Sequence, residues 1–317
     1  MRLVAILAII AIHAVQLDSP GPKWRSVILH ACHFAVPYFF MVSGFFFARR
    51  MANIDALKTQ TIRLLSIYAI ALVGYILLTP LSHIPWPPID SPLRVILFIL
   101  NGPGYHLWFL PALVMAFWGL HILRPMGFAA VFTVGGAAYI TGLLIEPYHN
   151  AAHLPGLGLN DVTWAAVARP FSSFLFVAIG LWFAERKSRI NLRMAILLAL
   201  IGLTLQMAES LWLYKSGYGT FNPPDYSIGT LVFGVSVFLA TLTWKGNVPP
   251  VLAKWGQLTL WIYIFHPAVL YVLRLVLKSN QPLPSLERII LACALSFALA
   301  LLVYSGRLAK AQTLPKH

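Results

Sequence analysis

The feature that most constrains this chain is a recurring apolar run, long enough each time to cross the hydrocarbon core of a membrane. That core is roughly 30 Å thick, and a helix needs about 20 predominantly apolar residues to span it. Hydrophobic residues make up 59% of the 317 residues and charged residues only 10%, a balance that soluble globular domains do not show. The sequence therefore predicts an all-α polytopic membrane protein.

Each apolar run ends at proline, glycine or charged residues, and these residues divide the chain into about ten predicted transmembrane helices. We treat these helices as one bundle, because backbone hydrogen bonds within the membrane must close inside each span. A short interfacial helix is expected at 93–100, and no soluble domain is expected among these residues. The predicted spans are 3–17, 28–48, 64–80, 107–123, 127–145, 170–184, 192–213, 227–244, 258–277 and 286–304.

Basic and acidic residues are distributed unevenly between the two sets of loops. Of the 23 basic residues, 15 fall on one side, whereas 7 of the 9 acidic residues fall on the other. Cationic loops are retained in the cytoplasm, so both termini are expected there, with a short basic tail at 307–317 after a membrane domain at 1–306. The basic residues form no stripe with interleaved aromatics, which argues against nucleic acid as a partner.

The first apolar run carries Arg2 and His13. A basic residue before an apolar stretch is also typical of a cleavable signal peptide, but the sequence AIHAVQ offers no clean cleavage site. Ten spans require this segment to remain in place. The run is short for a span and begins almost at Met1, so we expect that further residues precede it.

Arg2 and His13 are eleven residues apart, which in a helix places them on one face and about 16 Å apart along its axis. An imidazole inside a membrane helix is costly unless it has a partner, and such residues commonly mark a pathway or a site. Two interpretations of His13 stay open at this point. It is a functional residue, or it is hydrogen-bonded to a neighbouring helix near the outer interface.

The second predicted span contains HFAVPYFFMVSGFFFARR. Pro37 interrupts the backbone bonding of this span, and Ser43 and Gly44 allow another helix or a ligand to approach closely. Taken alone, the motif favours helix packing through small residues.

Taken together, the motifs resemble those of the bacterial integral-membrane acyltransferase family 3. Arg2 and His13 are followed in order by VPYFFMVSGFFF, Arg49 and Arg50, LKTQTIRLLSIY, YHLWFL and LTLWIYIFHP, over nearly the whole chain. The resemblance implies an O-acyltransferase that moves an acyl group, expected to be acetyl, from cytoplasmic acyl-CoA to a hydroxyl of an extracytoplasmic or lipid-linked glycan. It also implies the bacterial cytoplasmic (inner) membrane and a role in polysaccharide modification.

Two positions depart from the pattern of that family. Gln60 stands three residues before Arg63, where a second arginine is usual, and Lys58 is the nearby substitute. The aspartate that usually precedes the first-span arginine is absent, which agrees with the expectation of further residues before Met1.

The chemistry that the resemblance implies suits an imidazole. A sugar hydroxyl is a poor nucleophile at neutral pH, and imidazole is the side chain best suited to remove its proton, so we assign the general base to His13. Ser43 is the candidate donor to the oxyanion, with helix packing as an equal alternative. Direct transfer and a covalent acyl-histidine both remain open.

The phosphates of coenzyme A should attract cations on the cytoplasmic side. Simple retention of positive loops is the alternative reason for Arg49, Arg50 and Lys58. The expected donor-binding residues are Arg2, Arg49, Arg50, Lys58 and Arg63.

Four further residues are candidates for binding the carbohydrate or glycolipid acceptor. Glu209 and His266 lie near the predicted outer ends of their spans, where each binds a hydroxyl or orients a partner, or simply reaches water. His106 and Trp108 lie beside an outer loop that also contains Trp86. Aromatic faces there stack on sugars or form the usual interfacial belt.

The main rival hypothesis is a transporter or flippase of a glycan or lipid intermediate, without acyl-transfer chemistry. Transporters often show repeats and ionisable residues at the midplane, and neither is evident here. A third hypothesis is a non-catalytic partner of polysaccharide-assembly proteins, which has no need of His13. The stretch HACH completes no tetrahedral ligand set, so no metal is expected.

Overall fold

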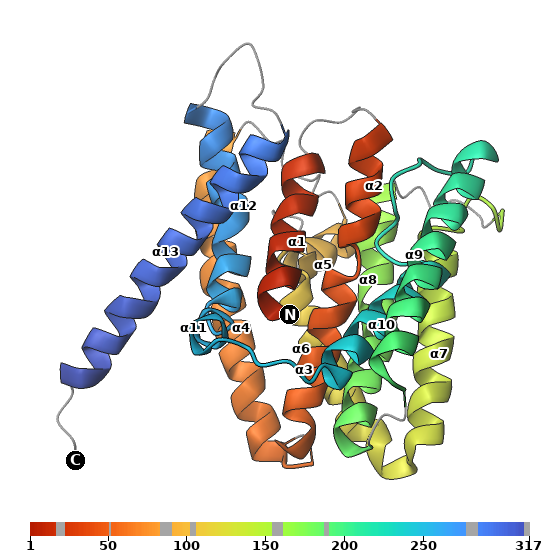
Figure 1. Cartoon of the computed structure of the whole chain (residues 1–317), viewed down its shortest axis with the longest axis horizontal. Coiled ribbons are helices and arrows are strands. Elements are labelled where there is room, and N and C mark those ends of the chain that lie inside the picture. Colours follow the sequence, from red (N-terminus) through yellow and green to blue (C-terminus); the bar gives the residue numbers. More distant parts are fainter. Residues whose placement is uncertain are drawn as a thin grey trace. The chain divides into compact units, whose positions relative to one another are not determined.

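Every regular element in the described part of the chain is a helix, as the composition predicts. The computed structural model describes residues 1–16, 23–50, 52–82, 91–101, 106–153, 161–186, 190–276 and 285–313. The helices, in chain order (Figure 1), are α1 (Arg2–Gln16), α2 (Lys23–Cys32), α3 (Ala35–Phe47), η1 (Ala48–Arg50), α4 (Ile54–Ser82), α5 (Pro92–Asn101), α6 (Phe109–Leu123), η2 (Arg124–Met126), α7 (Phe128–Ile145), α8 (Asp161–Glu185), α9 (Leu192–Lys215), α10 (Ile228–Thr243), α11 (Pro250–Trp255), α12 (Thr259–Val276) and α13 (Ser285–Thr313).

Each of the ten predicted spans coincides with helix in this part of the chain. Seven helices there are long and apolar enough to cross a membrane, so the protein is a multi-pass membrane protein. They are Trp24–Arg50, Ile54–Leu78, Phe109–Met126, Phe128–Ile145, Val167–Glu185, Leu192–Lys215 and Leu286–Ser305. The other three positions hold shorter apolar helices, Arg2–Val15, Ile228–Thr243 and Thr259–Leu273. The full count of ten and the cytoplasmic termini stay predictions.

The fourth helix begins ten residues before the predicted span. Asn53 caps it, since its side-chain oxygen accepts from the backbone N–H groups of Asp55 at 2.8 Å and Ala56 at 3.1 Å. Such caps satisfy donors that the helix itself leaves unpaired. The first turns of α4 are polar, so hydropathy marks only the later, apolar part. The expected short helix at 93–100 is confirmed as α5.

The second predicted span is interrupted, but one turn before the proline. The interruption lies at His33 and Phe34, between α2 and α3. Pro37 has no N–H to donate to the carbonyl four residues earlier, which is that of His33. The ring of His33 is itself anchored, because Nδ1 donates to the Leu29 carbonyl at 2.8 Å.

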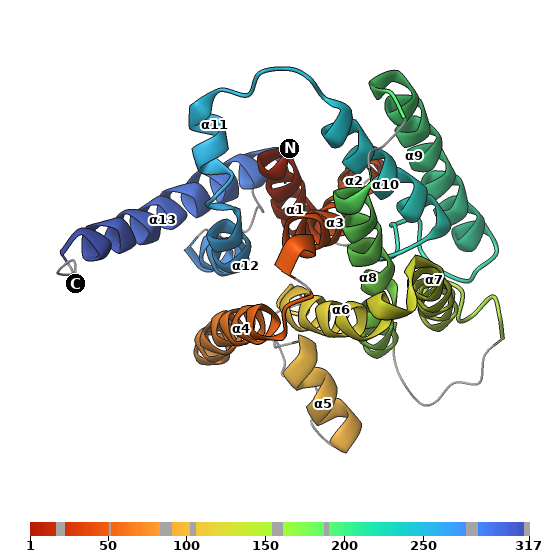
Figure 2. The ribbon, with the colours of Figure 1, turned by 90° about the horizontal axis from the view of Figure 1, so that it is seen from below.

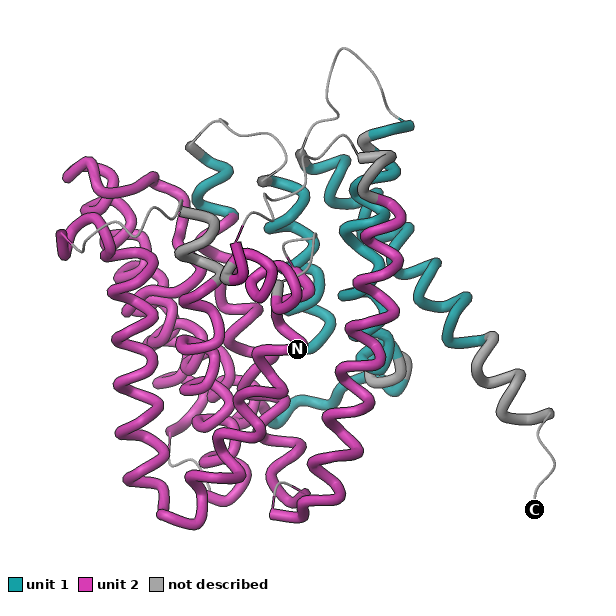
Figure 3. Tube along the Cα trace, turned by 180° about the vertical axis from the view of Figure 1, so that it is seen from behind, with its two compact units in different colours: residues 1–28, 245–317 teal, residues 29–244 magenta. Residues whose placement is uncertain are grey.

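The helices group into two compact units, coloured separately in Figure 3. Unit 1 comprises residues 1–28 and 245–317, and unit 2 comprises residues 29–244. No linker composition marks these boundaries in the sequence. In unit 1, α1 packs against both α12 and α13, which also pack against each other. The predicted tail begins as helix, since α13 continues to Thr313.

In unit 2, α8 is the central helix. It packs against α3, α6 and α7, while α9 pairs with α10 and α10 also meets α3. Figure 2 shows α8 standing between α3, α6 and α7. The core of unit 2 contains three fully buried aromatic residues, Phe40 of α3, Phe176 of α8 and Tyr226 of the connection between α9 and α10.

Glycines allow the closest of these helix pairs to meet backbone to backbone. A Cβ at Gly44 would fall on the carbonyl oxygen of Val177, and one at Gly180 would fall on that of Met41. Small residues commonly mediate helix contact in membranes because they let backbones approach. The Ser-Gly motif of the second span therefore supports the crossing of α3 and α8.

Candidate functional site

Two of the predicted site residues lie side by side in unit 1. His13 on α1 and His266 on α12 have ring centroids 5.2 Å apart and planes tilted by 41°. His266 is fully buried, whereas His13 is half-buried. The structure thus brings together a residue from the first apolar run and one from the end of the chain.

The orientation of His266 follows from its own helix. Its Nδ1 lies 3.1 Å from the Ile262 carbonyl, one turn earlier. A carbonyl only accepts, so Nδ1 carries the hydrogen and Nε2 of the neutral ring is the acceptor nitrogen. Pro267 follows directly and cannot donate to the Tyr263 carbonyl, which removes one hydrogen bond from α12 beside the imidazole. Orientation of a partner and contact with the acceptor by His266 both stay predictions.

Arg288 on α13 is a site residue that sequence reasoning missed. Its Nη1 donates to the Ala14 carbonyl at 3.1 Å, and the side chain is buried. That carbonyl is one of the last four of α1, which lack partners within the helix. Arg288 therefore ties α13 to the residue next to His13. An arginine two residues into an otherwise apolar run was the available signal.

Arg2 stands at the start of α1, which is helical without interruption to Gln16. The predicted spacing therefore holds, with Arg2 and His13 about 16 Å apart along the axis. Arg2 is half-buried.

The hydroxyl of Ser43 is engaged within its own helix. Its Oγ donates to the Phe39 carbonyl at 2.8 Å, a common arrangement for serine inside a helix. Together with the close contact at Gly44, this geometry favours the packing interpretation. Oxyanion stabilisation by Ser43 stays a prediction.

The predicted donor-binding cations of unit 2 gather around the turn that joins α3 to α4. The side chains of all four are exposed. They are Arg49, Arg50, Lys58 and Arg63. We call this set the exposed cations. Donor binding by these residues stays a prediction.

Glu209 has a structural role that the sequence did not indicate. Its two carboxylate oxygens accept from the backbone N–H groups of Ile228 and Gly229, each at 3.0 Å. A carboxylate at a helix N-terminus satisfies unpaired donors and complements the helix dipole. Glu209 thus joins α9 to the start of α10, and substrate binding by this residue stays a prediction.

His106 and Trp108 are buried inside unit 2. The ring of His106 meets that of Tyr75 edge-on, with centroids 5.0 Å apart. The guanidinium carbon of Arg169 lies 5.2 Å from the centroid of the Trp108 ring. Trp108 is therefore no exposed belt residue, and its stacking on a sugar stays a prediction. Trp86 lies outside the described residues.

A second charged cluster was also missed by sequence reasoning. Arg169 on α8 donates from Nε to Asp225 Oδ2 at 2.6 Å. Asp225 lies in the connection between α9 and α10, followed by the fully buried Tyr226. The only advance signal was a charged residue at the edge of an apolar run, because 56 residues separate the two partners.

Comparison with known proteins gives one family. The family model described as an acyltransferase domain matches residues 1–305. A serine/alanine racemase of Enterococcus gallinarum is 25% identical over 296 residues, which cover 84% of this chain and 39% of that protein. An amino-acid racemase of Enterococcus faecalis is 27% identical over 328 residues, covering 95% of this chain and 45% of the relative. The chain thus spans less than half the length of these relatives. No solved structure matches.

Proposed function

Because the chain belongs to the integral-membrane acyltransferase family 3, we propose that it moves an acyl group, acetyl in the first instance, from acyl-CoA to a carbohydrate hydroxyl. The donor is taken from the cytoplasmic side, and the acceptor is an extracytoplasmic or lipid-linked glycan. The observation that carries the proposal is the pairing of His13 with the buried His266. The racemase names describe longer proteins, and we propose no racemase activity for this chain.

In the proposed reaction His13 is the general base. It removes the hydroxyl proton while the hydroxyl oxygen attacks the carbonyl carbon of the thioester. The new C–O bond forms, the C–S bond breaks, and the proton passes from the imidazole to the departing sulfur, which yields the coenzyme A thiol. A neutral imidazole suits both proton transfers, because the ordinary pKa of an imidazole lies near neutral pH.

His266 is proposed as a positioning residue for His13. Its Nδ1 is held by the Ile262 carbonyl, so its ring cannot turn without breaking that hydrogen bond. Arg288 holds the adjacent backbone at Ala14.

The donor is proposed to be held by Arg2 and by the exposed cations, through its phosphates. The separation of about 16 Å along α1 between Arg2 and His13 suits an extended pantetheine arm. The proposal needs no metal. It places the protein in the bacterial cytoplasmic membrane, with polysaccharide-assembly proteins as candidate partners.

The test uses the full chain in vesicles and follows release of the coenzyme A thiol from acetyl-CoA. His13→Ala should lower turnover by roughly 100-fold or more, as expected for loss of a general base, with an unchanged melting temperature. The matched control is His121→Ala, which removes a half-buried histidine of α6 and should keep full turnover. Equal activity of His13→Ala and wild type would overturn the assignment.

The rival transporter or flippase gives a different result in the same vesicles. It predicts movement of a glycan or lipid intermediate with no release of thiol by the wild type. Incubation with labelled acetyl-CoA in the absence of acceptor distinguishes direct transfer from transfer through an acyl-histidine. Only the acyl-histidine route labels the protein.

A further inference from the structure

Four residues of unit 2 form a compact cluster that the proposed chemistry leaves unused. The ion pair of Arg169 and Asp225 is 2.6 Å long, and its two side chains are 11% and 35% exposed. Arg169 also lies over the ring of Trp108. The ring of Tyr226 meets Trp108 edge-on, with centroids 6.4 Å apart. We call these four residues the Arg169 cluster.

The hydroxyl of Tyr226 is the unexplained group in this cluster. The residue is completely buried, its ring stacks on Phe176 with centroids 5.6 Å apart, and its hydroxyl has no hydrogen-bond partner among the described residues. A buried hydroxyl in that condition destabilises the fold relative to phenylalanine. Folding alone therefore gives no reason for a tyrosine at this position.

Tyr226 is also kept in its donor form. It lies in the connection between α9 and α10, outside the spans. Burial, and next the carboxylate of Asp225, raise the pKa of Tyr226 well above its ordinary value. The hydroxyl therefore remains protonated at physiological pH and is available to donate to an oxygen atom.

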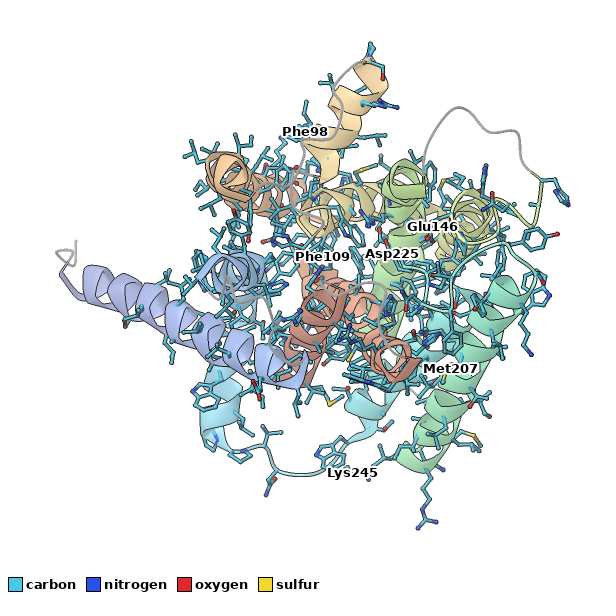
Figure 4. The ribbon with its side chains drawn as sticks, turned by 90° about the horizontal axis from the view of Figure 1, so that it is seen from above. Phe98, Phe109, Glu146, Met207, Asp225 and Lys245 are labelled. Atoms are coloured by element: carbon cyan, nitrogen blue, oxygen red, sulfur yellow. The ribbon has the colours of Figure 1, made fainter. Side chains whose placement is uncertain are left out.

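The charge around Tyr226 selects the class of ligand. The carboxylates of Asp225 and Glu146 both act on its hydroxyl, against the single guanidinium of Arg169. Figure 4 labels Asp225 and Glu146, both of unit 2. The one guanidinium of the cluster is already paired with the Asp225 carboxylate, which leaves little attraction for an anion. A carboxylate, a tyrosine hydroxyl and the ring of Trp108 together complement the donors, acceptors and apolar faces of an uncharged polyol.

We propose that the Arg169 cluster binds the acyl acceptor, and that this acceptor presents an uncharged saccharide. Tyr226 donates to a sugar oxygen, and Asp225 accepts from a sugar hydroxyl while Arg169 fixes its carboxylate. The role of this saccharide as acceptor rests on the proposed function. Its binding to the cluster can be measured without turnover.

The test measures binding and turnover on the full chain in nanodiscs. Cellobiose is the uncharged probe and cellobiouronic acid is its anionic counterpart. Wild type should bind cellobiose and should bind the uronic acid at least about tenfold more weakly. Tyr226→Phe should weaken cellobiose binding by about 5- to 10-fold, and Asp225→Asn by about 10- to 100-fold, as expected for neutral and charge-assisted hydrogen bonds. The KM for acetyl-CoA should not change.

The matched control is Tyr139→Phe. The hydroxyl of Tyr139 already donates to the Ser227 carbonyl at 2.7 Å, so its loss should lower the melting temperature but leave cellobiose binding unchanged. Tyr226→Phe should instead keep or raise the melting temperature, because it removes a buried hydroxyl that has no partner among the described residues.

The outcomes separate the two proposals. Cellobiose binding that depends on Tyr226, without any thiol release, would leave this inference standing and refute the acyl-transfer function. Acyl transfer whose acceptor KM is unchanged in folded Tyr226→Phe and Asp225→Asn would overturn this inference alone. Absence of cellobiose binding by wild type, or equal binding of the uronic acid, would also overturn it.

Discussion

Two ion pairs of nearly equal length lie at opposite ends of unit 2. Arg169 meets Asp225 at 2.6 Å, and Arg124 meets Glu185 at 2.5 Å. The first pair has side chains that are 11% and 35% exposed, whereas both side chains of the second are more than a third exposed. Distance alone would rank them as equals. Their surroundings differ, and the free energy of an ion pair depends mainly on how far its charges are removed from solvent.

The same contrast extends to the residues around each pair. The end that carries Arg169 also has the buried Trp108 and Tyr226 and the capping carboxylate of Glu209. The end that carries Arg124 has the exposed cations at the turn between α3 and α4. One end is thus organised by buried, directional contacts, and the other presents positive charge. The following substitutions test whether this difference is functional.

The largest effect is expected from Arg169→Met. Removing the guanidinium leaves Asp225 partly buried without its cation, which should lower the free energy of unfolding by about 2 to 3 kcal/mol. Thermal unfolding in detergent measures the change. The double variant Arg169→Met with Asp225→Leu should recover part of the loss, since neither charge then remains. A double variant no more stable than the single one would contradict the buried-pair interpretation.

Glu209→Gln should have an intermediate effect. It keeps the shape of the side chain but weakens two charge-assisted hydrogen bonds to Ile228 and Gly229, at a cost of about 1 kcal/mol. The melting temperature should fall while the KM for the acceptor stays constant. The opposite result, an unchanged melting temperature with a raised acceptor KM, would restore the predicted role of Glu209 in substrate binding.

The double variant Arg49→Ala with Arg50→Ala should leave stability nearly unchanged, because both side chains are exposed. The KM for acetyl-CoA should rise by about 3- to 10-fold at low salt, and the difference should shrink as salt screens the charges. Arg193→Ala, which removes another exposed cation near the start of α9, is the control and should not change this KM. An unchanged KM in the double variant would leave only a topological role for these arginines.

The smallest effect is expected from Arg124→Ala. An exposed ion pair contributes about 0 to 1 kcal/mol even when its geometry is good, so the melting temperature should change little. The guanidinium also lies over the Phe128 ring, 4.1 Å from its centroid, which adds a small packing loss. A destabilisation as large as that of Arg169→Met would remove the contrast between the two ends.

The fold was largely predictable from hydropathy, and the errors have physical causes. All ten apolar segments coincide with helices, since a membrane span must satisfy its backbone internally. The start of α4 was misplaced because its first turns are polar but capped by Asn53. The predicted interruption of the second span by Pro37 is present, and it lies one turn earlier, at His33 and Phe34, because proline removes the hydrogen bond to the carbonyl four residues before itself.

The candidate site was only half predictable. His13 and His266 were recognised through a family resemblance, and the structure places their rings together. Arg288 and Arg169 were not singled out, because each forms its hydrogen bond with a residue far along the chain, Ala14 and Asp225 respectively. Ser43 and Glu209 were functional candidates beside other interpretations, and their functional roles stay predictions. The sequence did not specify that Ser43 donates to the Phe39 carbonyl or that Glu209 accepts from the start of α10.

The sequence by itself determined that this chain is a helical membrane protein with charge sorted between its loops, because hydropathy and charge act locally along each segment. Only the tertiary structure decided which polar side chains meet. The pairs His13 with His266, Arg288 with Ala14, and Arg169 with Asp225 join different elements. A buried polar group is tolerated only where packing supplies a partner, and no pattern along the chain specifies which residue that partner will be.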